Sequence, residues 1–215
     1  MNKHLFIRAA ATGLVTAGLL AFPAMAADRT ETRDLKPFSK IELKGSADIY
    51  VEAGKEQSFT ITSSDKKLAR IETYVEGDTL IIKQKGRSWS GSSVDITINV
   101  NALHSLVIEG AADATLKNIK SDDFELMIAG AGDVNIVGTC GKADMNIAGA
   151  GDIDAKKFKC KSVDVDINGA GDADVYASDS AKATINGVGD VTVHGNPKTM
   201  RPRINGLGSI DVVEK

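Results

Sequence analysis

The chain has 215 residues, a formal net charge of −3, 42% hydrophobic residues and 26% charged residues. This mildly acidic balance argues against nucleic acid and anionic membrane surfaces as partners, because both would repel the chain. The length is enough for a short leader and one domain.

The first 26 residues have the organisation of a secretory signal peptide. Lys3 and Arg8 are followed by an apolar run over residues 9–22, and Ala24-Met25-Ala26 forms an Ala-x-Ala cleavage site. The apolar run is shorter than the roughly 20 residues of a membrane span. We therefore expect residues 1–26 to be removed on export and residues 27–215 to form the mature domain. Its expected location is the periplasm, with the cell surface or an association with the outer membrane as alternatives.

Residues 27–105 are the irregular half of the predicted domain. A polar lead over residues 30–40 is expected to cover the first coil, and residues 41–51 alternate around Gly45. Further along, residues 59–62 and 94–100 are predicted strands, residues 64–70 a helical turn, and residues 71–85 a hairpin around Gly77. The Gly/Ser-rich segment 86–93 holds the only tryptophan, Trp89. Trp89 is interpreted either as a hydrophobic flap over the sheet or as a contact for a sugar ring.

A unit of about 19 residues recurs along the chain. Its marker is the first glycine of a Gly-x-Gly-Asp pattern, with a degenerate copy at Gly45 and later copies at Gly110, Gly130, Gly149, Gly169, Gly187 and Gly206. Apolar and polar residues alternate on both flanks of the marker, which predicts two short strands joined at the glycines. Two residues before the marker stand Ile108, Ile128, Ile147, Ile167, Ile185 and Ile204. The residues directly after the marker are expected on the inside of a tight corner: Ala111, Ala131, Ala150, Ala170, Val188 and Leu207.

These repeats predict an all-β fold. A unit this small cannot bury a face alone and must stack on its neighbours, which is typical of repeat architectures. The predicted fold is a two-sheet parallel β-solenoid of Gly-x-Gly-Asp coils about 4.8 Å apart, preceded by the irregular N-terminal half. In the last coil, Arg201, Pro202 and Arg203 are expected to blunt the open edge, because proline cannot donate to a strand ladder.

An aspartate stands three residues after most markers. Carboxylates stacked about 4.8 Å apart would repel by about 0.9 kcal/mol in bulk water, so they need solvent, backbone donors or cations. One aspartate per coil supplies few of the six to eight oxygens that calcium prefers. Turn capping is therefore the favoured interpretation and a cation site the alternative; no cofactor or metal is expected. The file consists of Asp48, Asp113, Asp133, Asp152, Asp172 and Asp190.

The two cysteines share one phase of the repeat. Cys140 and Cys160 each lie nine residues before the marker of the following unit. Equal phase places them one above the other in adjacent coils, at a spacing compatible with the roughly 4.4 to 6.8 Å between α-carbons that a disulfide needs. Export to an oxidising compartment favours the bond. The sequence therefore predicts a disulfide, with two unpaired buried thiols as the alternative.

No group of residues has the pattern of a catalytic site. His104 and His194 lie several coils apart, and no serine or cysteine is placed to be activated by either. The favoured prediction is therefore a protein that is not an enzyme. The alternative is a polysaccharide-binding protein or a carbohydrate-active enzyme, suggested by the solenoid shape and by Trp89 next to Arg87.

Several of these segments together resemble one bacterial family. The Phe38-x-x-Ile41 and Gly45-Ser46-Ala47-Asp48 opening, the Leu80-Ile81-Ile82 strand and the Gly-x-Gly-Asp repeats are similar to DUF2807, the autotransporter adhesin "head GIN" domain. The resemblance implies a β-solenoid related in shape to pectate lyases, without their catalytic residues, and a role in adhesion. We expect an adhesion or cell-envelope interaction module whose partner is an envelope protein or a glycan, with oligomerisation left open.

Overall fold

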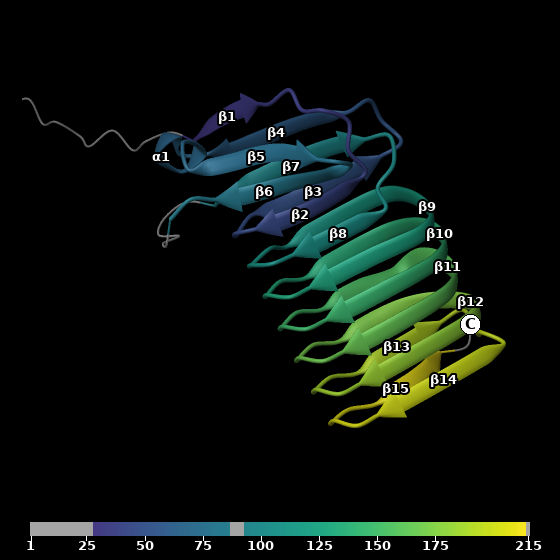
Figure 1. The fold of residues 1–215 in the computed structure, drawn as a ribbon. Coiled ribbons are helices and arrows are strands. Elements are labelled where there is room, and N and C mark those ends of the chain that lie inside the picture. Colours follow the sequence, from purple (N-terminus) through teal and green to yellow (C-terminus); the bar gives the residue numbers. More distant parts are fainter. Residues whose placement is uncertain (1–27, 87–92, 214–215) are drawn as a thin grey trace, which may run out of the picture.

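A computed structural model describes residues 28–86 and 93–213 and shows a β-solenoid of about five turns, as the repeats predicted (Figure 1). The predicted signal peptide and Trp89 lie outside these residues. Within them the only helix is α1 (Asp65–Leu68). The strands are β1 (Arg29–Thr32), β2 (Lys40–Lys44), β3 (Asp48–Ala53), β4 (Ser58–Ser63), β5 (Ile71–Glu76), β6 (Thr79–Gln84), β7 (Asp95–Val100), β8 (Ser105–Ile108), β9 (Ala114–Ile128), β10 (Val134–Ile147), β11 (Ile153–Ile167), β12 (Ala173–Ile185), β13 (Val191–His194), β14 (Thr199–Ile204) and β15 (Ile210–Val213).

Each long strand from β9 to β12 serves two repeat units. It leaves one Gly-x-Gly-Asp turn, bends, and runs back to the next turn, so the solenoid has two edges (Figure 1). We call the line of Gly-x-Gly-Asp turns the turn edge. The opposite line, where the strand register shifts, is the bend edge and comprises residues 117–122, 137–142, 156–161 and 176–180. Between the edges the pairing is parallel, so equivalent residues of successive coils face one another.

The N-terminal end of the solenoid is closed by additional strands. β2 and β3 stack in parallel on β8 and β9, so the Gly45 copy is a true coil. β6 and β7 form the next parallel layer outward. The antiparallel strands β5 and β4 then cover β6 and β7, which confirms the predicted hairpin. β1 pairs with β4, although residues 30–40 were expected only as a polar lead. Arg33 joins the two sides of this cap, because its Nη1 donates to Ile71 O at 2.8 Å.

Aliphatic side chains fill the interior between the two sheets. The isoleucines before the markers are buried in every coil except the last, where Ile204 is 46% exposed and Val212 42% exposed. One coil earlier, Ile185 and Val193 are fully buried. The difference arises because β14 and β15 pair only with the preceding coil. Among the described residues, β14 and β15 are therefore the outermost strands at this end, and Pro202 lies within β14.

The residues directly after the marker glycines do not lie inside the corner, so that prediction was wrong. They are exposed in all six turns, with Val188 54% and Leu207 70% exposed. The close approach is made by the glycines themselves. A β-carbon at Gly149 would overlap the carbonyl oxygen of Gly130 in the preceding coil, and the same holds for the other markers. Backbone packing at the corner therefore demands glycine, while the next side chain points outward.

None of the helical segments among residues 28–86 and 93–213 is long and apolar enough to cross a membrane.

Candidate functional site

The aspartates of the turn edge link successive coils. Each Oδ1 accepts a hydrogen bond from the backbone N–H at the same position of the next coil, so the carboxylate caps its neighbour's turn. The distances are 3.2 Å from Asp133 N to Asp113, 3.0 Å from Asp152 N to Asp133, 2.7 Å from Asp172 N to Asp152, 2.7 Å from Asp190 N to Asp172 and 2.6 Å from Ser209 N to Asp190. At the start of the file, burial raises the pKa of Asp48, and the carboxylates of Asp113 and Asp95 raise it further. Backbone donors thus offset part of the repulsion along this edge.

Across the described parts of the chain, no three His, Cys, Asp or Glu side chains lie close enough together to hold a metal ion. We therefore expect a chelator such as EDTA to leave the melting temperature unchanged. Asp152→Asn should be nearly silent, because the amide keeps the oxygen that accepts from Asp172 N–H. Asp152→Ala should cost about 1 kcal/mol through loss of that hydrogen bond. Urea titrations of both variants measure the difference; a fall of many degrees on chelation would support a cation site instead.

The bend edge carries the predicted disulfide. Cys140 in β10 and Cys160 in β11 are opposite one another in the ladder and are joined, with their α-carbons 4.4 Å apart. The bond closes a chain segment with a sequence separation of 20. Next to it, the Phe124 and Phe158 rings pack edge to face with centroids 5.2 Å apart. The disulfide and this aromatic pair link neighbouring coils at and beside the bend edge.

Removing the disulfide is expected to destabilise the domain without changing its fold. The double variant Cys140→Ser/Cys160→Ser should lose about 3 kcal/mol of unfolding free energy, because the unfolded chain regains the freedom of a loop of about 20 residues. Urea unfolding followed by circular dichroism measures the loss. Wild-type protein unfolded in the presence of reductant serves as the control and should match the variant. A wild-type curve that is insensitive to reductant would contradict this prediction.

A groove runs across the bend edge above the disulfide. Its volume is about 630 Å³, and its lining includes His104, Lys120, Lys159, Lys161 and Tyr176. Lys159 Nζ lies 3.7 Å from the centroid of the Tyr176 ring and donates to Lys156 O at 3.0 Å. This cation–π contact holds the ammonium group at the wall of the groove. We call this hollow the lysine groove.

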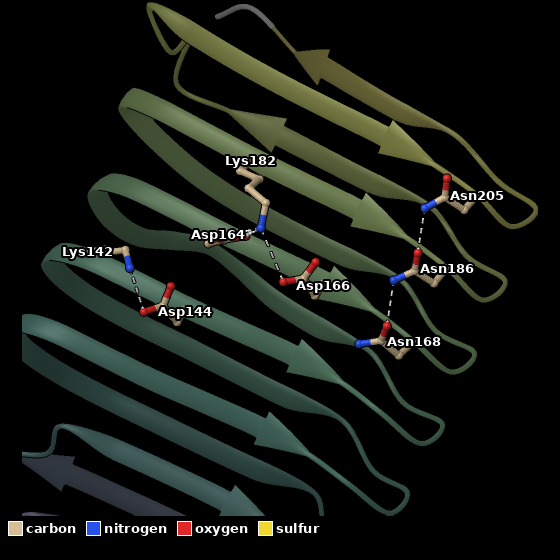
Figure 2. A network of polar contacts seen from close by, with 8 residues as sticks. All are labelled: Lys142, Asp144, Asp164, Asp166, Asn168, Lys182, Asn186 and Asn205. Carbon is tan, nitrogen blue, oxygen red and sulfur yellow. Dashed lines mark hydrogen bonds and ion pairs between the residues drawn. The ribbon is translucent and has the colours of Figure 1, made fainter.

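One outer face carries ion pairs and an amide ladder (Figure 2). Lys182 Nζ forms ion pairs with Asp164 at 2.9 Å and with Asp166 at 3.7 Å, and the hydrogen bond that Lys182 donates to Asp164 raises the pKa of Lys182. Exposed pairs of this kind contribute under about 1 kcal/mol each. Nearer the turn edge, the side-chain amides of Asn168, Asn186 and Asn205 form a ladder with two hydrogen bonds of 2.8 Å. The face is therefore ordered and polar.

The opposite outer face shows a second column of polar side chains. The residues five positions after the markers pair in register from coil to coil: Thr115, Asn135, Asp154, Asp174, Thr192 and Asp211. We call this set the polar column. Because the coils are parallel, its members repeat at about 4.8 Å along the solenoid axis. The polar column therefore places one polar side chain at the same position of each of these coils.

His104 and His194 lie on different coils, as the repeat spacing predicted. The expectation that no serine is placed next to either histidine was wrong, because His104 Nδ1 is 2.8 Å from Ser121 Oγ at the bend edge. His194 is in β13, where its Nε2 lies 3.6 Å from Asp174 Oδ1. Ser121 also hydrogen-bonds the backbone oxygen of Asp123, so its hydroxyl is already engaged.

The basic character of the bend edge was not predicted. Its four segments, 117–122, 137–142, 156–161 and 176–180, hold seven lysines and two aspartates. The net charge of −3 for the whole chain hides this cluster, because acidic residues at other positions of the repeat, including the turn edge, outnumber these lysines. Counting the charged residues at each position of the repeat would have revealed this lysine cluster, since Lys120 and Lys159 both lie ten residues before a marker.

Comparisons with known proteins agree with this architecture. The sequence profile of DUF2807, described as the putative auto-transporter adhesin, head GIN domain, matches residues 37–197. A putative adhesin from Bacteroides fragilis NCTC 9343 superimposes with a TM-score of 0.72 at 23% identity, covering 88% of this chain and 98% of that chain. A putative lipid binding protein from Parabacteroides distasonis ATCC 8503 gives a TM-score of 0.49 at 22% identity, covering 87% and 97%. No curated protein matches. At 23% identity, the Bacteroides fragilis structure shows a shared fold.

Proposed function

This chain belongs to the DUF2807 family of head GIN domains, and from that premise we propose that it is an exported, non-enzymatic module for adhesion or cell-envelope interaction. The family description supports adhesion, and the predicted leader over residues 1–26 supports export to the periplasm or beyond. The partner we propose is an envelope glycan or protein.

The polar column is the observation that carries this proposal. Its side chains are in register across the solenoid, so a partner with its own repeat meets one similar contact in each coil. Each contact is weak, but several formed together raise the overall affinity through their effective concentration. Repeat proteins commonly bind through such extended surfaces.

The turn-edge carboxylates form hydrogen bonds within the fold, which supports a role without catalysis. The aspartates of the turn edge accept backbone hydrogen bonds from the next coil, so these carboxylates stabilise the fold. Glycoside hydrolysis needs a pair of carboxyl groups about 5 to 9.5 Å apart with pKa values set to different tasks. From Asp113 to Asp190, the turn-edge carboxylates instead form a row in which each accepts the same kind of backbone hydrogen bond.

The proposal is tested by scoring binding and turnover together. Residues 27–215 are incubated with intact bacterial cells and with a panel of envelope glycans, and both retention and release of new reducing ends are measured. We expect binding without release. Deleting residues 188–206, which span one marker interval, should weaken binding while keeping the Gly-x-Gly-Asp phase and a β-rich circular dichroism spectrum. New reducing ends above a boiled control would refute the non-enzymatic proposal.

A further inference from the structure

The lysine groove is a hollow that the repeat geometry creates at one place. Cys140 is opposite Ser121 in the preceding coil and Cys160 in the next, and Gly141 follows it. A β-carbon at Gly141 would lie 2.5 Å from Asp122 O, so the middle coil has no side chain there. The coils on either side carry Asp122 and Lys161 at the lining of the groove. The lack of a side chain at Gly141, between the side chains of Asp122 and Lys161 in the adjacent coils, produces the depression.

Positive charge dominates this hollow. Lys120 and Lys159 both align with Thr139 from opposite sides, so their α-carbons are two coils, or about 9.6 Å, apart. Lys120 and Lys161 are exposed, and the ion pairs found within the described ranges 28–86 and 93–213 include neither of them. Asp122 is the carboxylate among the groove residues. Three ammonium groups therefore converge against one carboxylate.

The groove also offers neutral hydrogen-bonding groups beside the lysines. Thr139 and Ser178 line it together with the disulfide, and the Tyr176 ring forms part of its wall. Its volume of about 630 Å³ falls in the range of roughly 300 to 1,000 Å³ that is usual for small-ligand sites. Hydroxyl groups next to ammonium groups suit a ligand that carries both hydroxyls and negative charge. An acidic sugar has both.

We propose that the lysine groove binds the anionic groups of an acidic polysaccharide, and this inference rests on the proposed adhesive function. Lys120 and Lys161 meet the charged groups directly, and Lys159 does so from the position that Tyr176 fixes. A chain with negative groups at regular intervals can reach Lys120 and Lys159 at the same time. The negative charge is a carboxylate, sulfate or phosphate carried on the sugar.

The charge distribution favours a polysaccharide over nucleic acid or a membrane. The row of aspartates on the turn edge repels a long polyanion that tries to wrap the solenoid, so attraction is confined to the bend edge. A membrane surface would need a flat basic face, whereas these lysines surround a hollow at an edge. A flexible acidic chain can enter the hollow from solvent.

The test compares charged and neutral polymers on the mature chain, residues 27–215. The probes are polygalacturonate for carboxylate, dextran sulfate for sulfate, a phosphorylated dextran for phosphate, neutral dextran, and duplex DNA. Affinity is measured between about 50 and 200 mM salt. We expect at least one acidic polysaccharide to bind, with neutral dextran and DNA binding at least about tenfold more weakly.

Variants then assign the site. Lys120→Ala/Lys161→Ala should weaken binding of the acidic polysaccharide at least about tenfold. The slope of log affinity against log salt concentration should fall in magnitude by about two, because two positive charges are removed. Lys120→Arg/Lys161→Arg should retain binding, because the charge is kept. The matched control Lys66→Ala/Lys83→Ala removes the same charge from the capped end and should change nothing. All variants should keep the wild-type melting temperature, since the altered side chains are exposed.

Three outcomes would overturn the groove assignment: no acidic polysaccharide binds, the alanine pair binds as wild type does, or DNA binds more tightly than every polysaccharide. Retention on cells that survives Lys120→Ala/Lys161→Ala would leave the adhesive function standing and remove the groove from it. Release of reducing ends would instead refute the adhesive module itself. The two proposals therefore fail in different ways.

Discussion

Replacing Gly149 with alanine is expected to separate the two halves of the solenoid. The added β-carbon would overlap the carbonyl oxygen of Gly130, a backbone atom held by the strands on both sides. Relief requires the coils to move apart at the turn edge, which breaks the hydrogen bond from Ala150 N to Gly130 O, 2.8 Å long. We expect a loss of about 4 kcal/mol or more, placing this methyl group among the most damaging single changes. Urea unfolding and hydrogen exchange over β10 and β11 measure it.

A neighbouring substitution controls for side-chain size at the same turn. Ala150 is exposed, and valine occupies its position in a later coil as Val188. Ala150→Val adds more atoms than Gly149→Ala and should still change stability by under about 0.5 kcal/mol. Equal stability of the Gly149→Ala variant and wild type would show that the corner can open, against the stacking described above.

Placing aspartate at position 147 is expected to unfold the central coils. Ile147 is fully buried between the two sheets, with Ile128 and Ile167 opposite it in the adjacent coils. A carboxylate there has no partner and would stay protonated or draw water into the core, at a cost of about 4 kcal/mol or more. The variant should lose protection from proteolysis in β10 and β11 first. Limited proteolysis with mass spectrometry locates the cleavage sites.

The matched control moves the same charge by one residue. Asn146 points outward from the same strand, and its counterpart in the next coil is already Asp166. Asn146→Asp should therefore cost under about 1 kcal/mol, mainly through repulsion from that carboxylate in solvent. If Ile147→Asp unfolds no more readily than Asn146→Asp, the inward assignment of Ile147 is wrong.

The periodic part of the fold could be predicted from the sequence because each position has one environment. The alternation around Gly149 shows which side chains face inward, and the equal phase of Cys140 and Cys160 places them in contact. The same logic failed for Ala150. Pattern alone cannot say whether a small residue is inside the corner or whether its neighbouring glycine makes the contact. That distinction depends on backbone atoms of another coil.

The cap could be predicted only in pieces. Residues 71–85 form an antiparallel hairpin that local turn chemistry predicts, but the parallel pairing of its strand β6 with β2 joins segments without a shared period. β1 is short and polar, so its pairing with β4 depends on that strand's free edge rather than on its own sequence. The lysine groove was missed for a related reason: lysines at positions 120, 159 and 161 converge only once the bends are superimposed.

Among the residues that the structure describes, the N-terminal end of the solenoid is covered by extra strands and the other end is not, and this difference favours folding from the N-terminal end. The closed end is built from residues 29–86 and 93–117, with each layer depending on segments of this same N-terminal region. Every later coil needs only the coil before it, about 19 residues back in the chain. A ribosome or an export channel delivers the chain in that same order, so the cap can be complete while later coils are still unmade. Each later coil can then pair with a preceding coil that is already folded, and this pairing needs no residue that has yet to emerge.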